Sequence, residues 1–223
     1  MFQLWMRVSS ILRKEVFRMA KNKKVLYPVV FMIGITIVFT SVLALINEVS
    51  AERILQQSRL KEQSKVLYAF NIDYGETGED IIRQYNQFIE ERQIGNQIYY
   101  VRKSNNEVTG YAFKIEGAGL WGGIEAILAF TQDFNKLTGV AFLNHSETPG
   151  LGGRIDEEWF QEQFRDISLD VNDTEPYLIF RPSSGGNVDT ISGATSTSKA
   201  VLNIFNQNIE VILTEIKGGV LNE

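Results

Sequence analysis

The longest uninterrupted hydrophobic pattern in the sequence lies at residues 25–47. These 23 residues include no Asp, Glu, Lys or Arg. An α-helix of this length, rising about 1.5 Å per residue, crosses the roughly 30 Å hydrocarbon core of a bilayer, so the pattern predicts a membrane-spanning helix. A cleaved signal peptide is a poorer interpretation, because its apolar core is shorter and ends at small residues, whereas Ile46, Asn47 and Glu48 follow here. A buried core helix is also disfavoured.

Helical spacing of apolar residues continues on both sides of this span. In residues 2–19 apolar residues recur at helical spacing with basic residues among them. This pattern favours an amphipathic helix on the anionic inner leaflet or against a partner's membrane helices. A solvated basic tail is the alternative. We therefore expect a cytoplasmic basic amphipathic segment over residues 1–24. Residues 48–70 place intermittent apolar positions among charges and predict a helical stalk.

From residue 71 onward the pattern alternates between helical and strand periods. Residues 78–92 carry one apolar stripe and predict a helix. Four short segments rich in β-branched and aromatic residues, separated by turn clusters, predict antiparallel hairpins: 97–103, 108–116, 125–131 and 138–144. Further elements are expected as helices over 156–165 and 195–217 and as strands over 177–181 and 188–191. The sequence thus predicts one α+β domain over residues 71–223, with an antiparallel sheet flanked by helices.

Charge gives the expected orientation of this domain. Residues 1–24 contain seven basic residues and one acidic residue, which leaves 15 basic and 26 acidic residues for the rest of the chain, a formal balance of −11. Because short basic flanks stay in the cytoplasm, we expect the N-terminus inside and the domain outside, in the periplasm of a bacterium with a single-pass inner-membrane anchor. The acidic balance argues against nucleic acid as a partner.

The chain contains no cysteine. An exported domain of this size buries enough core to fold without disulfides. The absence of thiolate ligands also excludes an iron–sulfur cluster or a structural zinc held by this chain's own cysteines. A redox role would therefore need a cofactor held in another way.

Residues 117–122 form the first of three glycine-rich segments and literally satisfy G-x-G-x-x-G. A dinucleotide-binding glycine turn opens a helix, whereas residues 123–131 look at least as much like a strand, so that interpretation is disfavoured. A pocket loop is favoured over an ordinary tight loop, because its glycines let the backbone approach a ligand while Leu120 and Trp121 supply an apolar wall.

Residues 145–153 form the second segment, which carries the only histidine, His145, together with Glu147, Thr148 and three glycines. One histidine and one glutamate two residues apart are too few ligands for a metal site, and we expect none. A satisfied surface histidine is the default interpretation. The density of glycine and polar residues nevertheless indicates a loop shaped around a polar group.

Residues 189–198 form the third segment, at the expected start of the C-terminal helix. Hydroxyl side chains occupy four consecutive positions from Thr195, where unpaired backbone N–H groups and the helix dipole favour an anion. Helix capping accounts for one or two of these hydroxyls. It does not account for Gly193 and Ala194, small residues that keep bulk away from Thr195.

Asp189, Ser192, Gly193, Ala194 and Thr195 match the flavin-attachment pattern D-x-x-[ST]-G-A-[ST]. The chain resembles the FMN-binding family typified by NqrC of the sodium-translocating NADH:quinone oxidoreductase and RnfG of the Rnf complex. The resemblance covers the whole chain: a basic N-terminus, one span, a stalk, and then the three glycine-rich segments in the family's order.

The resemblance implies that Thr195 carries FMN through a phosphoester bond, installed by a flavin transferase that uses FAD and a divalent metal. It implies that Thr197 and Ser198 hydrogen-bond the phosphate, and that Asp189 and Ser192 serve the transferase or the shape of the loop, with Gly193 and Ala194 completing the motif. It also implies a set of residues that line the flavin: Leu120, Trp121, Gly122, Glu147, Thr148, Pro149, Gly150, Leu151 and Gly152.

The expected function is that of an electron carrier in a membrane respiratory complex, with other membrane proteins of that complex as partners and no substrate chemistry or catalytic residues of its own. The segment Leu120, Trp121, Gly122 looks more like the quinone-reductase type, NqrC, than like its Rnf counterpart, so we expect the former. The equivalent RnfG component of an Rnf ferredoxin:NAD⁺ oxidoreductase is the alternative. Two less favoured alternatives remain. One is a membrane-tethered module that binds a small ligand noncovalently, and the other is an interaction protein whose loops are only turns.

Overall fold

The computed structural model describes residues 23–95, 97–105, 107–169 and 176–221. The chain divides into two compact units, Met1–Gln56 and Gln57–Glu223, which are described separately. The amphipathic segment predicted over residues 2–19 lies outside the described residues.

The described residues of the first unit, 23–56, all belong to helix α2 (Lys23–Ala69). Within the described residues it is the one helix that is long and apolar enough to cross a membrane, judged by length and composition. Two hydroxyls in its apolar part bond within the helix: that of Thr36 donates to the carbonyl of Met32, and that of Ser41 to the carbonyl of Ile37. Such bonds reduce the cost of placing hydroxyl groups in an apolar medium.

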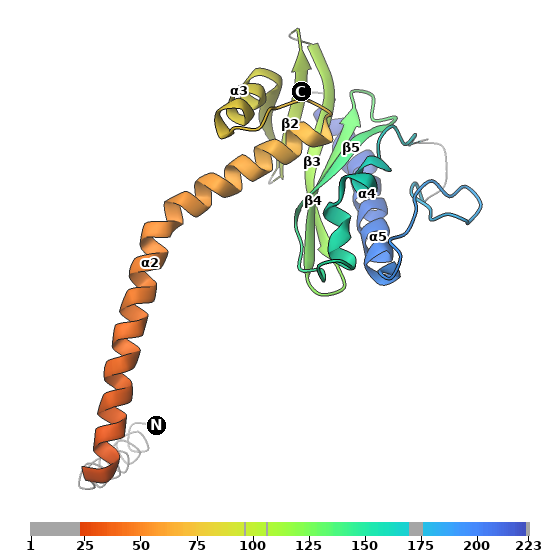
Figure 1. The fold of residues 1–223 in the computed structure, drawn as a ribbon. Helices are drawn as coiled ribbons and strands as arrows, with labels where there is room; N and C mark the ends of the chain where they lie inside the picture. Colours follow the sequence, from red (N-terminus) through yellow and green to blue (C-terminus); the bar gives the residue numbers. More distant parts are fainter. Residues whose placement is uncertain (1–22, 96, 106, 170–175, 222–223) are drawn as a thin grey trace, which may run out of the picture. The chain divides into compact units, whose positions relative to one another are not determined.

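The second unit is built on a five-stranded antiparallel meander (Figure 1). Its strands are β1 (Ile89–Ile94), β2 (Gln97–Ser104), β3 (Glu107–Ala118), β4 (Gly123–Thr131) and β5 (Leu137–Asn144). The strands pair in sequence order, each with the next. This sheet confirms the predicted α+β class.

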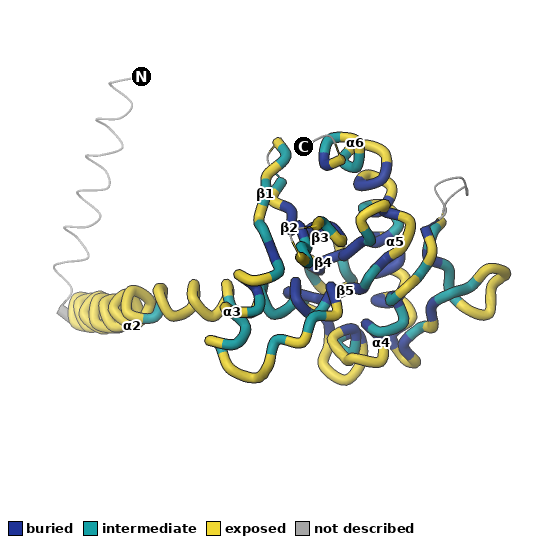
Figure 2. The backbone as a smooth tube through the Cα atoms, turned by 90° about the horizontal axis from the view of Figure 1, so that it is seen from above, coloured by how far each residue is buried: buried dark blue, intermediate teal, exposed yellow. Residues whose placement is uncertain are grey.

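Both faces of the sheet are covered, so the middle parts of its central strands are largely buried (Figure 2). In β4, Leu128 and Phe130 belong to one hydrophobic core, whereas Ile127 and Ala129 belong to the other. Burial on both faces explains why this segment reads as a continuous apolar run rather than as an alternation.

Helices pack on both faces of the sheet and contribute side chains to both cores. The remaining helical elements are α3 (Gly78–Phe88), η1 (Gly152–Asp156), α4 (Glu158–Glu162), α5 (Thr195–Val211), η2 (Ile212–Ile216) and α6 (Lys217–Val220). Phe160 of α4 and Phe205 of α5 pack in the same core as Phe142 of β5. The opposite core contains Leu67 and Phe70, at and just beyond the end of α2. The last turns of α2 are therefore part of the globular unit.

The predicted helix over residues 78–92 was wrong at its end. Helix α3 stops at Phe88, and the next residues form β1, whose Ile89 and Ile94 pair with Arg102 and Gln97 of β2. A positive φ of 57° at Gly95 lets the chain turn back on itself. Cross-strand pairing therefore overrides the helical stripe, and β1 joins the four strands that were predicted as hairpins.

Two predicted strands and the ends of two predicted helices also differ from the prediction. Among the described residues, those at 177–181 and 188–191 form only an isolated parallel bridge between Phe180 and Val188. The helix expected over 156–165 is confined to α4 after a 3₁₀ turn. The helix expected over 195–217 is confirmed at its start but changes to a π-turn at Ile212.

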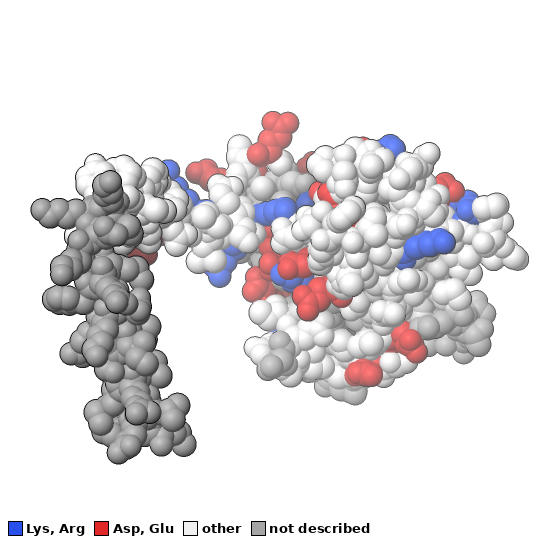
Figure 3. All heavy atoms as spheres, turned by 90° about the horizontal axis from the view of Figure 1, so that it is seen from below, with Lys and Arg blue, Asp and Glu red and all other residues white. Residues whose placement is uncertain are grey.

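Acidic and basic side chains are intermixed on the face of the globular unit shown in Figure 3. Ion pairs of the described globular unit include Arg165 with Glu162 at 2.6 Å and Arg181 with Asp189 at 2.8 Å.

Candidate functional site

Thr195 is the first residue of α5 and is exposed. The preceding turn is closed by a hydrogen bond of 3.0 Å from the Ala194 amide to the Ile191 carbonyl. Gly193 occupies its third position with φ 79°, the conformation that a type II turn requires there. Within the described chain, no side chain caps this helix start. The hydroxyl of Thr195 thus stands beside unpaired backbone N–H groups, where an anion is stabilised.

Thr197 and Ser198, predicted to hold a phosphate, are both buried and have other partners. The Thr197 hydroxyl donates to Glu147 Oε2 at 2.6 Å. The Ser198 hydroxyl donates to the Ala194 carbonyl and accepts from the Ile191 amide, each at 3.0 Å. A bond to a phosphate would require each hydroxyl to leave its present acceptor. Ser198 instead fixes the turn that precedes Thr195.

Glu147 connects all three glycine-rich segments. Its Oε1 accepts hydrogen bonds from the backbone amides of Leu120 at 2.8 Å and Trp121 at 3.1 Å, and its Oε2 accepts from Thr197. The side chain is 4% exposed. Segments that are far apart in the sequence therefore meet at one buried carboxylate, as the prediction of a common site requires.

Two glycines are needed for this carboxylate to fit. A Cβ at Gly119 would stand 2.6 Å from Glu147 Oε1, and a Cβ at Gly152 would stand 2.8 Å from Oε2 and 2.5 Å from the Thr197 hydroxyl oxygen. Contacts this short do not occur between real side chains and a Cβ. The glycines thus make room for the Glu147 side chain as well as shaping their loops.

The segment at 145–153 folds into a tight turn. The amide of Leu151 donates to the Thr148 carbonyl at 3.1 Å, with Pro149 second and Gly150 third at φ 74°, which is the sequence signature of a type II turn. The Gly153 amide bonds to the same carbonyl at 2.9 Å. This turn leaves Thr148, Pro149, Gly150 and Leu151 exposed.

Exposed apolar side chains lie on these loops. Leu120, Trp121 and Leu151 are 53%, 69% and 47% exposed. Leu151 is next to the turn before Thr195, because its Cδ2 lies 3.4 Å from the position of a Cβ on Gly193. Unpaired apolar surface of this kind suits a flat aromatic ligand.

Asp189 and Ser192 are exposed at the start of the third segment. The Asp189 carboxylate accepts from Arg181 Nη1 at 2.8 Å, and its amide donates to Gln163 Oε1 at 2.7 Å. Neither Arg181 nor Gln163 was singled out from the sequence, and no spacing pattern links them to the motif.

His145 is largely buried and has partners on both ring nitrogens. Its Nε2 lies 3.0 Å from Asp156 Oδ2, and its Nδ1 accepts from the Glu147 amide at 3.2 Å. It therefore holds the backbone of the residue that links the loops. Within the described part of the chain, no group of three His, Asp or Glu side chains is placed to hold a metal ion.

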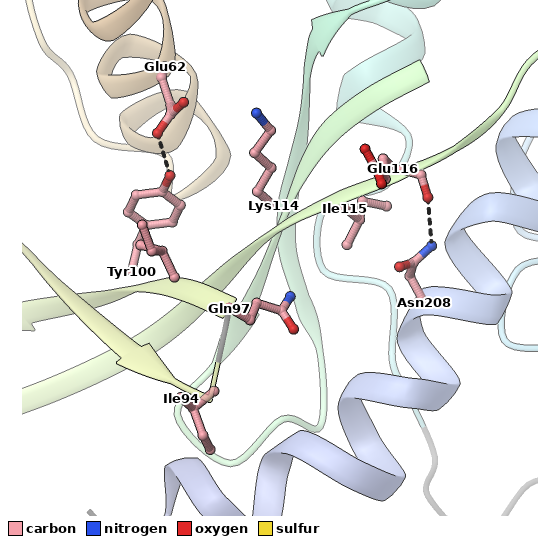
Figure 4. Close-up of a pocket in the computed structure, with 9 residues that line it drawn as sticks. Glu62, Ile94, Gln97, Tyr100, Lys114, Ile115, Glu116 and Asn208 are labelled. Atoms are coloured by element: carbon pink, nitrogen blue, oxygen red, sulfur yellow. Dashed lines mark hydrogen bonds between the residues drawn. The ribbon is translucent and has the colours of Figure 1, made fainter. Parts of the chain in front are cut away.

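Two hollows lie near the sheet. One, of about 730 Å³, adjoins the first glycine loop and is lined by Gly119, Gly122, Glu125 and Asn144 among others. Hydrogen bonds from Asn144 and Lys114 lower the pKa of the Glu125 carboxyl. The other, of about 770 Å³, lies where β2 and β3 diverge and is lined by Glu62, Tyr100, Lys114 and Asn208 among others (Figure 4). None of its lining residues belongs to the predicted flavin site.

The sequence matches the FMN-binding domain family over residues 119–210, which contain all three glycine-rich segments apart from Gly117 and Ala118. It is 31% identical to the G subunit of an ion-translocating oxidoreductase complex from Methanosarcina acetivorans, over 87% of this chain and 97% of that protein. It is also 31% identical to the C subunit of the Na(+)-translocating NADH-quinone reductase from Pasteurella multocida, over 56% of this chain and 52% of that protein. The chain thus spans about half the length of the latter relative.

Two solved structures share the fold. The structure of Shewanella oneidensis NqrC aligns with a TM-score of 0.59 at 17% identity, over 69% of this chain and 92% of that one. That of the C subunit of the Na(+)-translocating NADH-quinone reductase from Parabacteroides distasonis aligns with a TM-score of 0.61 at 22% identity, over 71% and 92%.

Proposed function

The chain belongs to the FMN-binding domain family, and from this premise we propose that it is a membrane-anchored electron carrier with FMN attached covalently to Thr195. The observation that carries the proposal is the placement of Thr195. It is an exposed hydroxyl at a helix start without a side-chain cap, and the exposed Leu151 lies against Gly193 in the preceding turn.

The residues present fit such a cofactor. The start of α5 offers backbone N–H groups for a phosphate ester, and Leu120, Trp121 and Leu151 offer apolar surface for a ring. Bound FMN would supply electron transfer at its isoalloxazine ring, while the protein supplies position and electrostatics. A covalent tether suits a domain outside the cytoplasm, where a dissociated cofactor would be lost.

The attachment step needs one reactive group from this chain. Thr195 Oγ1 would lose its proton to a base of the transferase or to water and form the bond to the phosphorus of the FMN moiety, as the pyrophosphate bond of FAD breaks and AMP leaves. The transferase would supply the divalent metal. Asp189 and Ser192 are exposed in the same segment as Thr195 and would be accessible to that enzyme.

The proposal also includes a membrane anchor and partner proteins. Helix α2 would span the inner membrane of a bacterium, with the basic N-terminal residues in the cytoplasm and the α+β unit outside it. The relatives named above are components of multi-subunit oxidoreductases, so the chain would pass electrons between other members of such a complex.

Two observations bear on which complex this is. The segment Leu120, Trp121, Gly122 favours the sodium-translocating NADH:quinone oxidoreductase, whereas the extent of similarity to the M. acetivorans protein favours an Rnf-type complex. Gene neighbourhood separates them: a quinone-reductase operon beside this gene supports the first, and a ferredoxin-linked operon supports the second.

Co-expression with a flavin transferase tests the attachment site. We expect the full-length chain to give a fluorescent band in a denaturing gel and to gain the mass of one FMN. Thr195→Ala should abolish both, whereas Ser196→Ala, which removes the neighbouring exposed hydroxyl, should retain them. A band that persists in Thr195→Ala refutes the site, and an unmodified, colourless wild type favours the noncovalent binding module.

A further inference from the structure

We infer that Glu147 is a positioning residue for flavin attachment: it clamps the loop at 117–122 to the start of α5 and so holds Thr195 beside the apolar side chains that receive the ring. This inference rests on the proposed function. It also revises the sequence-based expectation that Glu147 lines the flavin, because the carboxylate points inward.

The first step of the argument is the burial of the carboxylate. Glu147 is 4% exposed, and the partners of its carboxylate oxygens are two backbone amides and one hydroxyl. No ion pair links it to a described Lys or Arg side chain. Burying a carboxylate is costly unless it is hydrogen-bonded. The three hydrogen bonds and the nearby positive end of α5 therefore hold this side chain in one place.

The second step is the division of labour between its two oxygens. Oε1 holds the amides of Leu120 and Trp121, which determines where their exposed side chains lie. Oε2 holds Thr197, two residues beyond Thr195 in the first turn of α5. One rigid carboxylate thus fixes the distance between the proposed ring surface and the proposed attachment hydroxyl.

The third step is the support behind Glu147. Its amide is held by His145, which is itself paired with Asp156 at the end of η1. The absence of a side chain at Gly119 and Gly152 leaves the space that both oxygens occupy. Because these bonds join the loop to the helix through side chains of this chain alone, they would hold the elements of the site in place for the transferase.

Three variants of the full-length chain test the inference. Glu147→Ala removes the clamp, Thr197→Val cuts only its link to α5, and Glu147→Gln keeps the length and an acceptor oxygen. Glu210→Ala, an exposed glutamate on α5, is the matched control. Two quantities are measured: the initial rate of FMN incorporation by the transferase, and hydrogen exchange of the Leu120 and Trp121 amides in the flavin-free protein.

In Glu147→Ala we expect exchange of both amides to accelerate by roughly tenfold to a hundredfold, as loss of hydrogen bonds to a charged acceptor implies. Incorporation should slow by at least about tenfold, the equivalent of one such bond. Thr197→Val should slow incorporation while the two amides stay protected. In Glu147→Gln the amide oxygen can still accept from Leu120 and Trp121 and the NH2 group can donate to the Thr197 hydroxyl oxygen, so we expect both defects to be clearly smaller than in Glu147→Ala.

Wild-type incorporation in Thr197→Val would overturn the coupling to α5. Unchanged amide exchange in Glu147→Ala would overturn the clamp itself, and a defect in Glu147→Gln equal to that of Glu147→Ala would overturn the claim that hydrogen-bond geometry is responsible. If the wild type takes up no flavin, the proposed function fails, but the exchange experiment still decides whether the clamp exists.

Discussion

The hydroxyl of Thr197 donates a 2.6 Å hydrogen bond to the carboxylate of Glu147, 50 residues earlier in the chain. Both side chains are buried, at 2% and 4% exposure. The bond joins the first turn of α5 to the loop that follows β5. The geometry around Thr195 therefore depends on tertiary structure and not only on the local motif.

The first prediction concerns the space around this bond. Gly152→Ala would place a Cβ 2.5 Å from the Thr197 hydroxyl oxygen and 2.8 Å from Glu147 Oε2. We expect the free energy of unfolding to fall by about 1–3 kcal/mol, the usual cost of overpacking. Denaturant melts of the flavin-free chain measure it.

Gly123→Ala is the matched control for that substitution. A Cβ there meets no atom within 4 Å, and the residue lies in strand β4. We expect a change within about 0.5 kcal/mol. Equal effects of the two substitutions would mean that the crowding at Gly152 is relieved by small movements.

The second prediction separates ligand contact from stability at Trp121. Because this side chain is 69% exposed, Trp121→Ala should change the free energy of unfolding by less than about 0.5 kcal/mol. On the proposed function it should nevertheless alter the visible circular dichroism of the attached flavin, since the ring loses part of its apolar wall. Trp159→Ala, which removes a tryptophan outside the proposed site, is the control for the flavin spectrum. A flavin spectrum in Trp121→Ala identical to that of the wild type would argue against contact between Trp121 and the flavin.

Elements that depend on the residues of their own segment could be predicted from the sequence. The four strands from residue 97 to 144 were predictable because β-branched and aromatic runs are separated by turn residues. The start of α5 at Thr195 was predictable because small and hydroxyl residues precede an apolar stripe. The type II turns at Gly150 and Gly193 follow the same local chemistry.

Pairwise contacts over long separations were not predictable. Strand β1 continues the helical stripe of α3, and only pairing with β2 shows that Ile89 belongs to a strand. No local pattern indicates that the Thr197 hydroxyl, predicted to bind a phosphate, donates to Glu147, 50 residues earlier. The inward direction of Glu147 has the same explanation.

The third prediction concerns where the folding unit begins. Leu67 and Phe70 are fully buried in the core shared with Ile127. A fragment of residues 57–223 should therefore fold cooperatively. A fragment of residues 71–223 loses both side chains, each worth about 2–5 kcal/mol in a core, and should unfold at a markedly lower temperature or not fold at all.

Thermal melts followed by circular dichroism of the two fragments decide this boundary. A double substitution, Leu67→Ala with Phe70→Ala in the longer fragment, should reproduce most of the loss. Equal melting temperatures for the two fragments would show that the last turns of α2 are a dispensable stalk.

The fourth prediction is a pH dependence at the junction of α2 and α4. Glu162 accepts hydrogen bonds from Arg165 and from the Tyr68 hydroxyl, each at 2.6 Å, and these bonds lower the pKa of its carboxyl. A carboxyl whose pKa is lower in the folded state stabilises the protein fully above its unfolded pKa of about 4.3. This contribution is lost as the pH falls through the folded pKa. Since the side chain is 39% exposed, solvent screening keeps it below about 1 kcal/mol.

Urea melts of the flavin-free chain between pH 7 and pH 3 measure this contribution. Glu162→Gln removes the titrating group, so its stability should fall less steeply below pH 5 than that of the wild type, whereas Glu210→Gln, at an exposed position on α5, should follow the wild type. The Glu162→Gln curve should lie below the wild-type curve at pH 7, because the charged partner of Arg165 is lost there, and should approach it at low pH. Parallel curves at all pH values would show that Glu162 contributes through packing and not through its ionisation.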